Sequence, residues 1–161
     1  MNGPRLYTIG FTKTDAESFF ETLGKSNVRR VIDVRLNNSS QLSGFAKRDD
    51  LRYFLKSLHQ IDYLHLLDLA PTSEMLDTYK KYKGSWEEYE QAFLELIHRR
   101  QIEQNLPPEL IDGACLLCSE DTPEHCHRRL VAEYLLERDP SLTIEHLRPG
   151  GRGRRVEGGR V

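Results

Sequence analysis

The segment that most constrains the fold of this chain lies at residues 114–138. Four small or apolar residues at 114–117 indicate a buried strand, and the apolar spacing from residue 129 onward is typical of an amphipathic helix. Between them, residues 118–128 contain two thiols, three carboxylates, two imidazoles and one guanidinium. A strand that leads through a polar loop to a helix N-terminus is where open α/β sheets bind ligands. We therefore expect the functional site here.

The start of that helix is predicted from two neighbouring residues. Thr122 has a hydroxyl that can cap a helix, and Pro123 would then take the first helical position, where proline is tolerated. This interpretation places Cys126 and His127 in the first turn. There the helix dipole and free amides lower the pKa of a thiol, and the side chains of His127 and Arg128 add positive charge.

Five strands are predicted from apolar runs and from two-residue alternation, at residues 6–10, 28–34, 61–66, 114–118 and 142–147. The first two enclose a helix within about thirty residues, which predicts a βαβ unit with parallel strands. Residues 68–108 lack a strand pattern and predict two helices that pack through Trp86 and Phe93. The fold class is α/β: a single Rossmann-like domain whose mostly parallel five-stranded sheet is flanked by helices, with a helical insertion between strands three and four.

Length and composition fit one ordinary domain. With 161 residues, 38% hydrophobic and 30% charged, the chain can bury a core of its own. No apolar run approaches the ~20 residues of a membrane helix, and the first residues lack the hydrophobic region of a signal peptide. Three cysteines are an odd and low count, which favours reduced thiols over a disulfide framework. We expect a cytoplasmic protein without a membrane partner.

The C-terminal segment differs in composition from the rest. The α/β domain is predicted over residues 1–148, and residues 149–161 are predicted to be a flexible tail rich in glycine and arginine. Although the formal net charge is −2, residues 148–161 contain five arginines and one glutamate. The tail would either contact the phosphates of a nucleic acid or simply keep the chain soluble, and the sequence leaves both readings open.

Three interpretations of the polar loop compete. In the first, Cys118 or Cys126 is a reactive thiolate, and Glu120 and His127 serve as acid, base or orienting groups. In the second, both thiols and a histidine bind a metal such as zinc. In the third, Cys126 is a small buried residue beside a solvated helix start. Alternation along the strand places Cys115 on the face opposite Cys118, as a core residue.

Three of the predicted strands end in short motifs that can be compared with a known family. These motifs are Thr8-Ile9-Gly10, Asp33-Val34-Arg35, and Cys118-Ser119-Glu120 followed by Cys126-His127-Arg128. Together they resemble the domain of unknown function 488 family over about residues 6–147, although this chain has Phe11 where many members have a histidine. The resemblance implies the fold and a site at these motifs, and it implies no particular reaction.

The residues predicted to bind a substrate lie at strand ends and at the start of the central helix: Thr8, Gly10, Asp33, Arg35 and Arg128. An acid and an arginine at a strand end suit a polar or phosphorylated ligand, but a buried salt bridge explains Asp33 and Arg35 equally well. The sequence has no glycine-rich phosphate loop. No cofactor is therefore predicted, and zinc bound by Cys118, Cys126 and His127 is the alternative.

These residues predict a small enzyme that acts on a nucleotide, a nucleic-acid component or another anionic molecule. The alternatives are a non-catalytic module that binds nucleic acid or a phosphorylated ligand, and a metal-binding protein. A concave pocket in which Cys118 or Cys126 lies within reach of Glu120 or a histidine would favour the enzyme. A flat basic face with both thiols sealed in the core would favour the binding module.

Overall fold

The structure, a computed structural model, describes residues 3–39, 44–149 and 154–156. Its centre is one sheet with the strand order β3-β2-β4-β1-β5-β6. The first five strands are β1 (Arg5–Ile9), β2 (Arg30–Asp33), β3 (Asp62–His65), β4 (Ala114–Leu117) and β5 (Thr143–His146). All five run parallel, which confirms the predicted α/β fold with its parallel sheet. The strand β4 lies inside the sheet, between β2 and β1.

The sixth strand, β6 (Arg154–Val156), corrects the prediction of a flexible tail for these three residues. It pairs antiparallel with β5, so that Ile144 lies opposite Val156. The physical reason is that β5 would otherwise leave one row of backbone N–H and C=O groups unpaired at the sheet edge. Residues 150–153 and 157–161 of the predicted tail lie outside the described residues.

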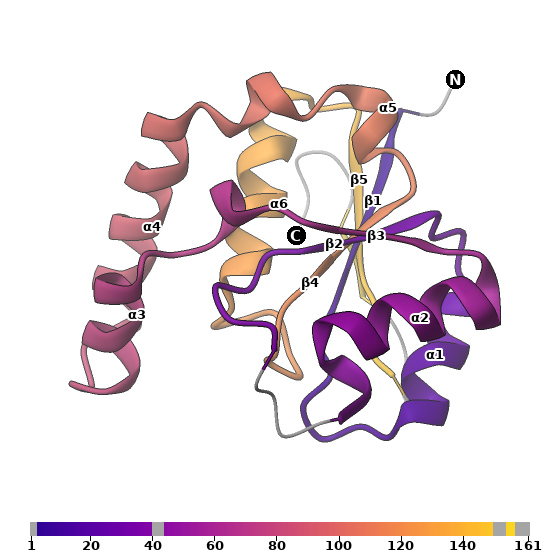
Figure 1. The fold of residues 1–161 in the computed structure, drawn as a ribbon. Coiled ribbons are helices and arrows are strands. Elements are labelled where there is room, and N and C mark those ends of the chain that lie inside the picture. Colours follow the sequence, from indigo (N-terminus) through magenta and orange to yellow (C-terminus); the bar gives the residue numbers. More distant parts are fainter. Residues whose placement is uncertain (1–2, 40–43, 150–153, 157–161) are drawn as a thin grey trace.

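Helices cover both faces of the sheet (Figure 1). On one face lie α1 (Ala16–Lys25) and α2 (Arg48–His59), and on the other lie α4 (Trp86–Arg100) and α6 (His127–Arg138). Two hydrophobic cores result, one on each side. α3 (Ser73–Lys80) packs on α4, and the short α5 (Pro108–Ile111) precedes β4.

The chain between β3 and β4 folds into helical elements because its start signals are local. The hydroxyl of Ser85 accepts a hydrogen bond from the Glu88 amide at 3.1 Å and so caps α4. Trp86 and Phe93 then enter the same core as Leu116 of β4. Within the described ranges, no helix has both the length and the apolar character that a membrane span requires.

Side-chain alternation along β4 is confirmed. Cys115 and Leu117 lie in the core under α1 and α2, whereas Leu116 and Cys118 lie in the core under α4 and α6. Burial raises the pKa of the Cys115 thiol well above its ordinary value. Cys115 is therefore a core residue, and the sheet separates it from Cys118.

Candidate functional site

The helix α6 begins at His127, so the predicted start near Thr122 is wrong. Residues 121–126 form bends and turns instead, and the Cys126 amide donates a hydrogen bond to the Pro123 carbonyl at 3.2 Å. Cys126 is the N-cap residue, with an extended backbone. Thr122 and Pro123 do not start the helix, because the loop first bends and brings Cys126 close to the end of β4.

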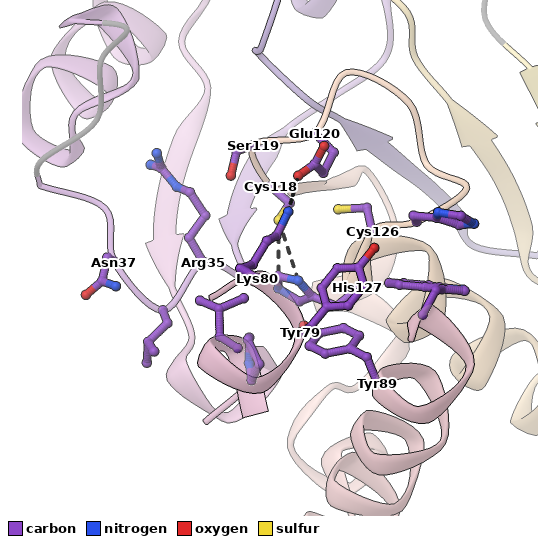
Figure 2. A pocket seen from close by; sticks show the side chains of 15 residues that line it. Arg35, Asn37, Tyr79, Lys80, Tyr89, Cys118, Ser119, Glu120, Cys126 and His127 are labelled. Atoms are coloured by element: carbon purple, nitrogen blue, oxygen red, sulfur yellow. Dashed lines mark hydrogen bonds and ion pairs between the residues drawn. The ribbon is translucent and has the colours of Figure 1, made fainter. Parts of the chain in front are cut away.

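Two thiols and one imidazole meet at the point where β4 ends and α6 begins. The Cys118 sulfur lies 3.5 Å from Nδ1 of His127, and one donor atom from each of Cys118, Cys126 and His127 lies within 4.8 Å of the others. Figure 2 shows the Cys126 side chain directed toward Cys118. The three residues are nearly buried, yet they line the inner end of a pocket of about 180 Å³.

The tautomer of His127 follows from its contact with the backbone. Nε2 lies 2.6 Å from the Val34 carbonyl oxygen, which can only accept, so Nε2 carries the proton. Burial lowers the pKa of the imidazole, which keeps the ring neutral and leaves Nδ1 unprotonated. The Cys118 sulfur is 3.5 Å from Nδ1 and 3.9 Å from Nε2, so it lies over the face of the ring. The lone pair of Nδ1 lies in the ring plane, so the ring must rotate before Nδ1 can accept a proton from the thiol.

Arg128 places a positive charge next to the thiols. Its side chain is fully buried, and Nη1 donates to the Glu120 carbonyl at 2.7 Å and to the Cys126 sulfur at 3.3 Å. Nε donates to the hydroxyl of Thr8 at 3.2 Å. Among the described residues, no carboxylate forms an ion pair with Arg128. Because a buried cation without a counter-charge is costly, a thiolate beside it is favoured.

The two thiols differ in acidity because one donates a hydrogen bond to the other. A hydrogen bond from Cys126, together with the charge of Arg128 and the Ser119 amide, lowers the pKa of Cys118 despite its burial. Burial and the bond to Cys118 raise the pKa of Cys126. The pair thus favours a single negative charge on Cys118. The sequence left Cys118 and Cys126 both open as the reactive thiol, and the argument for Cys126 rested on a place in the first helical turn that it does not have.

Aromatic side chains form one wall of the pocket. Trp86 and Tyr89 of α4 contact Tyr79 of α3 with ring centroids 5.6 and 4.9 Å apart, and His125 stacks on Trp86 at 4.9 Å. None of these rings was predicted as a site residue. Aromatic residues at helical spacing usually indicate a core, and nothing in the local sequence shows that α3 and α4 face the β4 loop.

The rim of the pocket carries an ion pair between two distant segments. Nζ of Lys80, at the end of α3, lies 2.7 Å from a carboxylate oxygen of Glu120 (Figure 2). Both side chains remain about half exposed. The pocket therefore has charged residues at its mouth, aromatic rings along one wall and the two cysteines at its inner end. The Glu120 carboxylate lies at the mouth, paired with Lys80.

Asp33 and Arg35, predicted to bind substrate, form a buried pair with each other. The Asp33 carboxylate accepts from Nε and Nη2 of Arg35 at 2.9 and 2.8 Å and from the Tyr63 hydroxyl at 2.5 Å. Asp33 is not among the residues that line the pocket. Arg35 lines it only in part, because its guanidinium points away from Cys118 toward Asp33 (Figure 2).

Thr8 and Gly10 lie outside the pocket and support the loop from behind. The Thr8 hydroxyl lies 2.7 Å from Nδ1 of His146 and accepts from Arg128, so it fixes the guanidinium. Gly10 packs directly against the backbone of Glu120: a Cβ atom added there would stand 1.6 Å from the Glu120 carbonyl oxygen. Only glycine fits at this position without moving the loop.

Comparison with known proteins gives one match. A family model described as "Domain of unknown function DUF488" matches residues 15–135, which include every residue that lines the pocket. No curated protein and no solved structure matches the chain.

Proposed function

This chain belongs to the DUF488 family, and on that premise we propose that it is an enzyme whose nucleophile is the Cys118 thiolate. The observation that carries the proposal is the grouping of Cys118, Cys126 and His127 in one pocket, with the buried Arg128 in contact with the Cys126 sulfur from outside the pocket lining. A pocket in which Cys118 lies beside a histidine is what we expected of an enzyme, whereas a binding module was expected to have a flat basic face.

Each residue of this group has a distinct role in the proposed reaction. After the ring has rotated, His127 takes the proton of Cys118 through Nδ1, and the hydrogen bond from Nε2 to the Val34 carbonyl fixes the tautomer before that step. Arg128 and the Cys126 thiol stabilise the thiolate. The sulfur then attacks an electrophilic carbon or phosphorus of the substrate and forms a bond as a leaving group departs. Water cleaves that covalent intermediate and regenerates the thiol.

The substrate class follows from the wall and mouth of the pocket. The rings of Tyr79, Trp86 and His125 offer flat surfaces for a heteroaromatic ring, and base–aromatic stacking contributes about 1–3 kcal/mol per base. Lys80 at the mouth can bind a phosphate once it separates from Glu120. These features support a nucleotide or a nucleic-acid component as the substrate.

A metal site is the second candidate, because Cys118, Cys126 and His127 lie close enough together to bind one ion. Two thiolates, one imidazole and an open fourth position are a known zinc arrangement, and the bond from Nε2 to the Val34 carbonyl is typical of a metal-binding histidine. Zinc would, however, neutralise both thiolates and leave Arg128 without a counter-charge. Metal analysis of the purified protein that found about one zinc per chain would favour this candidate.

Alkylation of the native protein tests the nucleophile directly. We expect iodoacetamide to modify Cys118 well below the ~8.5 pKa of a free thiol, because its folded pKa is lowered. Cys126 should react more slowly, and Cys115 only in denaturant, because burial raises both pKa values. Mass spectrometry of the labelled peptides across pH gives the three rates. Labelling of Cys126 first, or of no thiol without denaturant, would contradict the assignment.

Ligand binding can be followed through Trp86, the only tryptophan of the chain. Nucleoside monophosphates should quench its fluorescence in a saturable way, whereas ribose 5-phosphate, which lacks the ring, should not. Lys80→Met should weaken binding by at least about tenfold, the loss of one charge-assisted hydrogen bond. Lys81→Met is the matched control, since that exposed side chain lies next to Tyr82, away from the pocket. Equal effects of the two variants would exclude the proposed phosphate contact.

A further inference from the structure

The arrangement of Cys118 and Cys126 has a second chemical consequence besides nucleophilic attack. Cys118 follows β4, Cys126 precedes α6, and the loop between them contains neither helix nor strand. Their sulfur atoms lie no more than 4.8 Å apart, and the Cys126 side chain is directed toward Cys118 (Figure 2). Since the S–S bond is about 2.05 Å long, each sulfur needs to move by only about 1.4 Å to form it.

We propose that Cys118 and Cys126 are a redox modification site that a hydroperoxide converts into an intramolecular disulfide. The Cys118 thiolate attacks the peroxide oxygen, the O–O bond breaks, and the product is a sulfenic acid with the release of an alcohol or water. The Cys126 sulfur then displaces the hydroxyl as water and forms the S–S bond. A dithiol reverses the step by reducing the disulfide to two thiols while it becomes a disulfide itself.

The surroundings of the pair suit this chemistry. Both cysteines line the pocket, whose volume of about 180 Å³ is large enough for a small peroxide. Arg128 lies 3.3 Å from the Cys126 sulfur. Once Cys118 is an uncharged sulfenic acid, this guanidinium stabilises the negative charge that Cys126 takes as it attacks. The third thiol cannot compete, because Cys115 lies on the opposite face of the sheet. Only one pairing is therefore available to the three cysteines of the chain.

The disulfide would also remove the proposed nucleophile from the pocket. Oxidation would then switch the site off, and reduction would restore it. The chemical inference itself does not depend on the reaction that the protein catalyses. It rests on the positions of the two sulfurs, so it stands even if Cys118 performs no catalysis.

The test uses the full-length protein, hydrogen peroxide as the oxidant and a non-reducing mass measurement. After oxidation the free thiols are blocked, and cleavage after Glu120 and Glu124 separates the peptide with Cys115 and Cys118 from the peptide with Cys126. We expect the two peptides to remain linked until dithiothreitol is added. Cys115→Ala is the matched control and should form the same link. After oxidation of this variant, titration should detect no free thiol, because both of its cysteines are in the disulfide.

Single variants identify the order of the two steps. In Cys126→Ser the link should be lost completely, and Cys118 should accumulate as a sulfenic acid that dimedone traps. In Cys118→Ser neither the link nor the dimedone adduct should form. The proposal is overturned if the native protein oxidises Cys118 to the sulfinic acid without a link, or if both thiols remain reduced. Neither failure would alter the alkylation rates that test the proposed function.

Discussion

Replacing Arg128 with alanine is expected to lower the free energy of unfolding by about 3–5 kcal/mol. The substitution removes a fully buried side chain and leaves the Glu120 carbonyl and the Thr8 hydroxyl without their donor. It also removes the charge that favours the thiolate, so the pH at which iodoacetamide modifies Cys118 should rise. Denaturant unfolding at neutral pH and the alkylation series give the two measurements.

The matched control for Arg128 is Arg48→Ala, which changes an exposed arginine. Arg48 pairs with Asp49 at 3.0 Å on the surface, where solvent screens the attraction and such pairs contribute little to stability. We expect little loss of stability and no change in thiol reactivity. If the two arginine variants were equally stable, Arg128 could not be the residue that holds the loop against β1.

Gly10→Ala is expected to lower the free energy of unfolding by about 3 kcal/mol, although it adds only one methyl group. The new Cβ would lie 1.6 Å from the Glu120 carbonyl oxygen and 2.6 Å from its carbon. Both are backbone atoms, so no side chain can rotate away to relieve the overlap. The loop must shift, which also breaks the bond from Arg128 to Glu120 and opens the thiols to alkylation.

Gly44→Ala is the control for this substitution, because an added Cβ at Gly44 would have no atom within 4 Å. Its effect should stay within about 0.5 kcal/mol. Thermal or denaturant unfolding of both variants checks the contrast. A Gly10→Ala protein as stable as the wild type would show that the loop at residues 119–126 can move without cost, against the packing that we describe.

The strands were predictable because their signals are local. Each of the five parallel strands coincides with an apolar run or an alternating segment, and the alternation of Cys115 and Cys118 follows from strand geometry alone. The importance of residues 118–128 was visible for the same reason. A group of thiols, imidazoles and charges directly after a buried strand is unusual in a core and marks a site.

The rest depends on contacts between distant segments, which no local pattern encodes. The start of α6 was misplaced because the loop bends back toward β4 before the helix begins. The aromatic wall was missed because Trp86 and Tyr89 look like ordinary core residues of a helix. For Asp33 and Arg35 the sequence left ligand binding and a buried salt bridge open, and only the fold shows that Arg35 and Tyr63 satisfy the carboxylate within the protein.

The hydrogen bond between Thr8 and Arg128 has a consequence for how the chain folds. These residues are 120 positions apart in the sequence. β1 must also pair with both β4 and β5 before the sheet is complete. Such distant pairing slows folding, because the chain loses much loop entropy before the contacts form. The thiol pair depends on this distant contact, because the same guanidinium that binds Thr8 also donates to the Cys126 sulfur. The site therefore cannot be complete until two segments far apart in the chain have met.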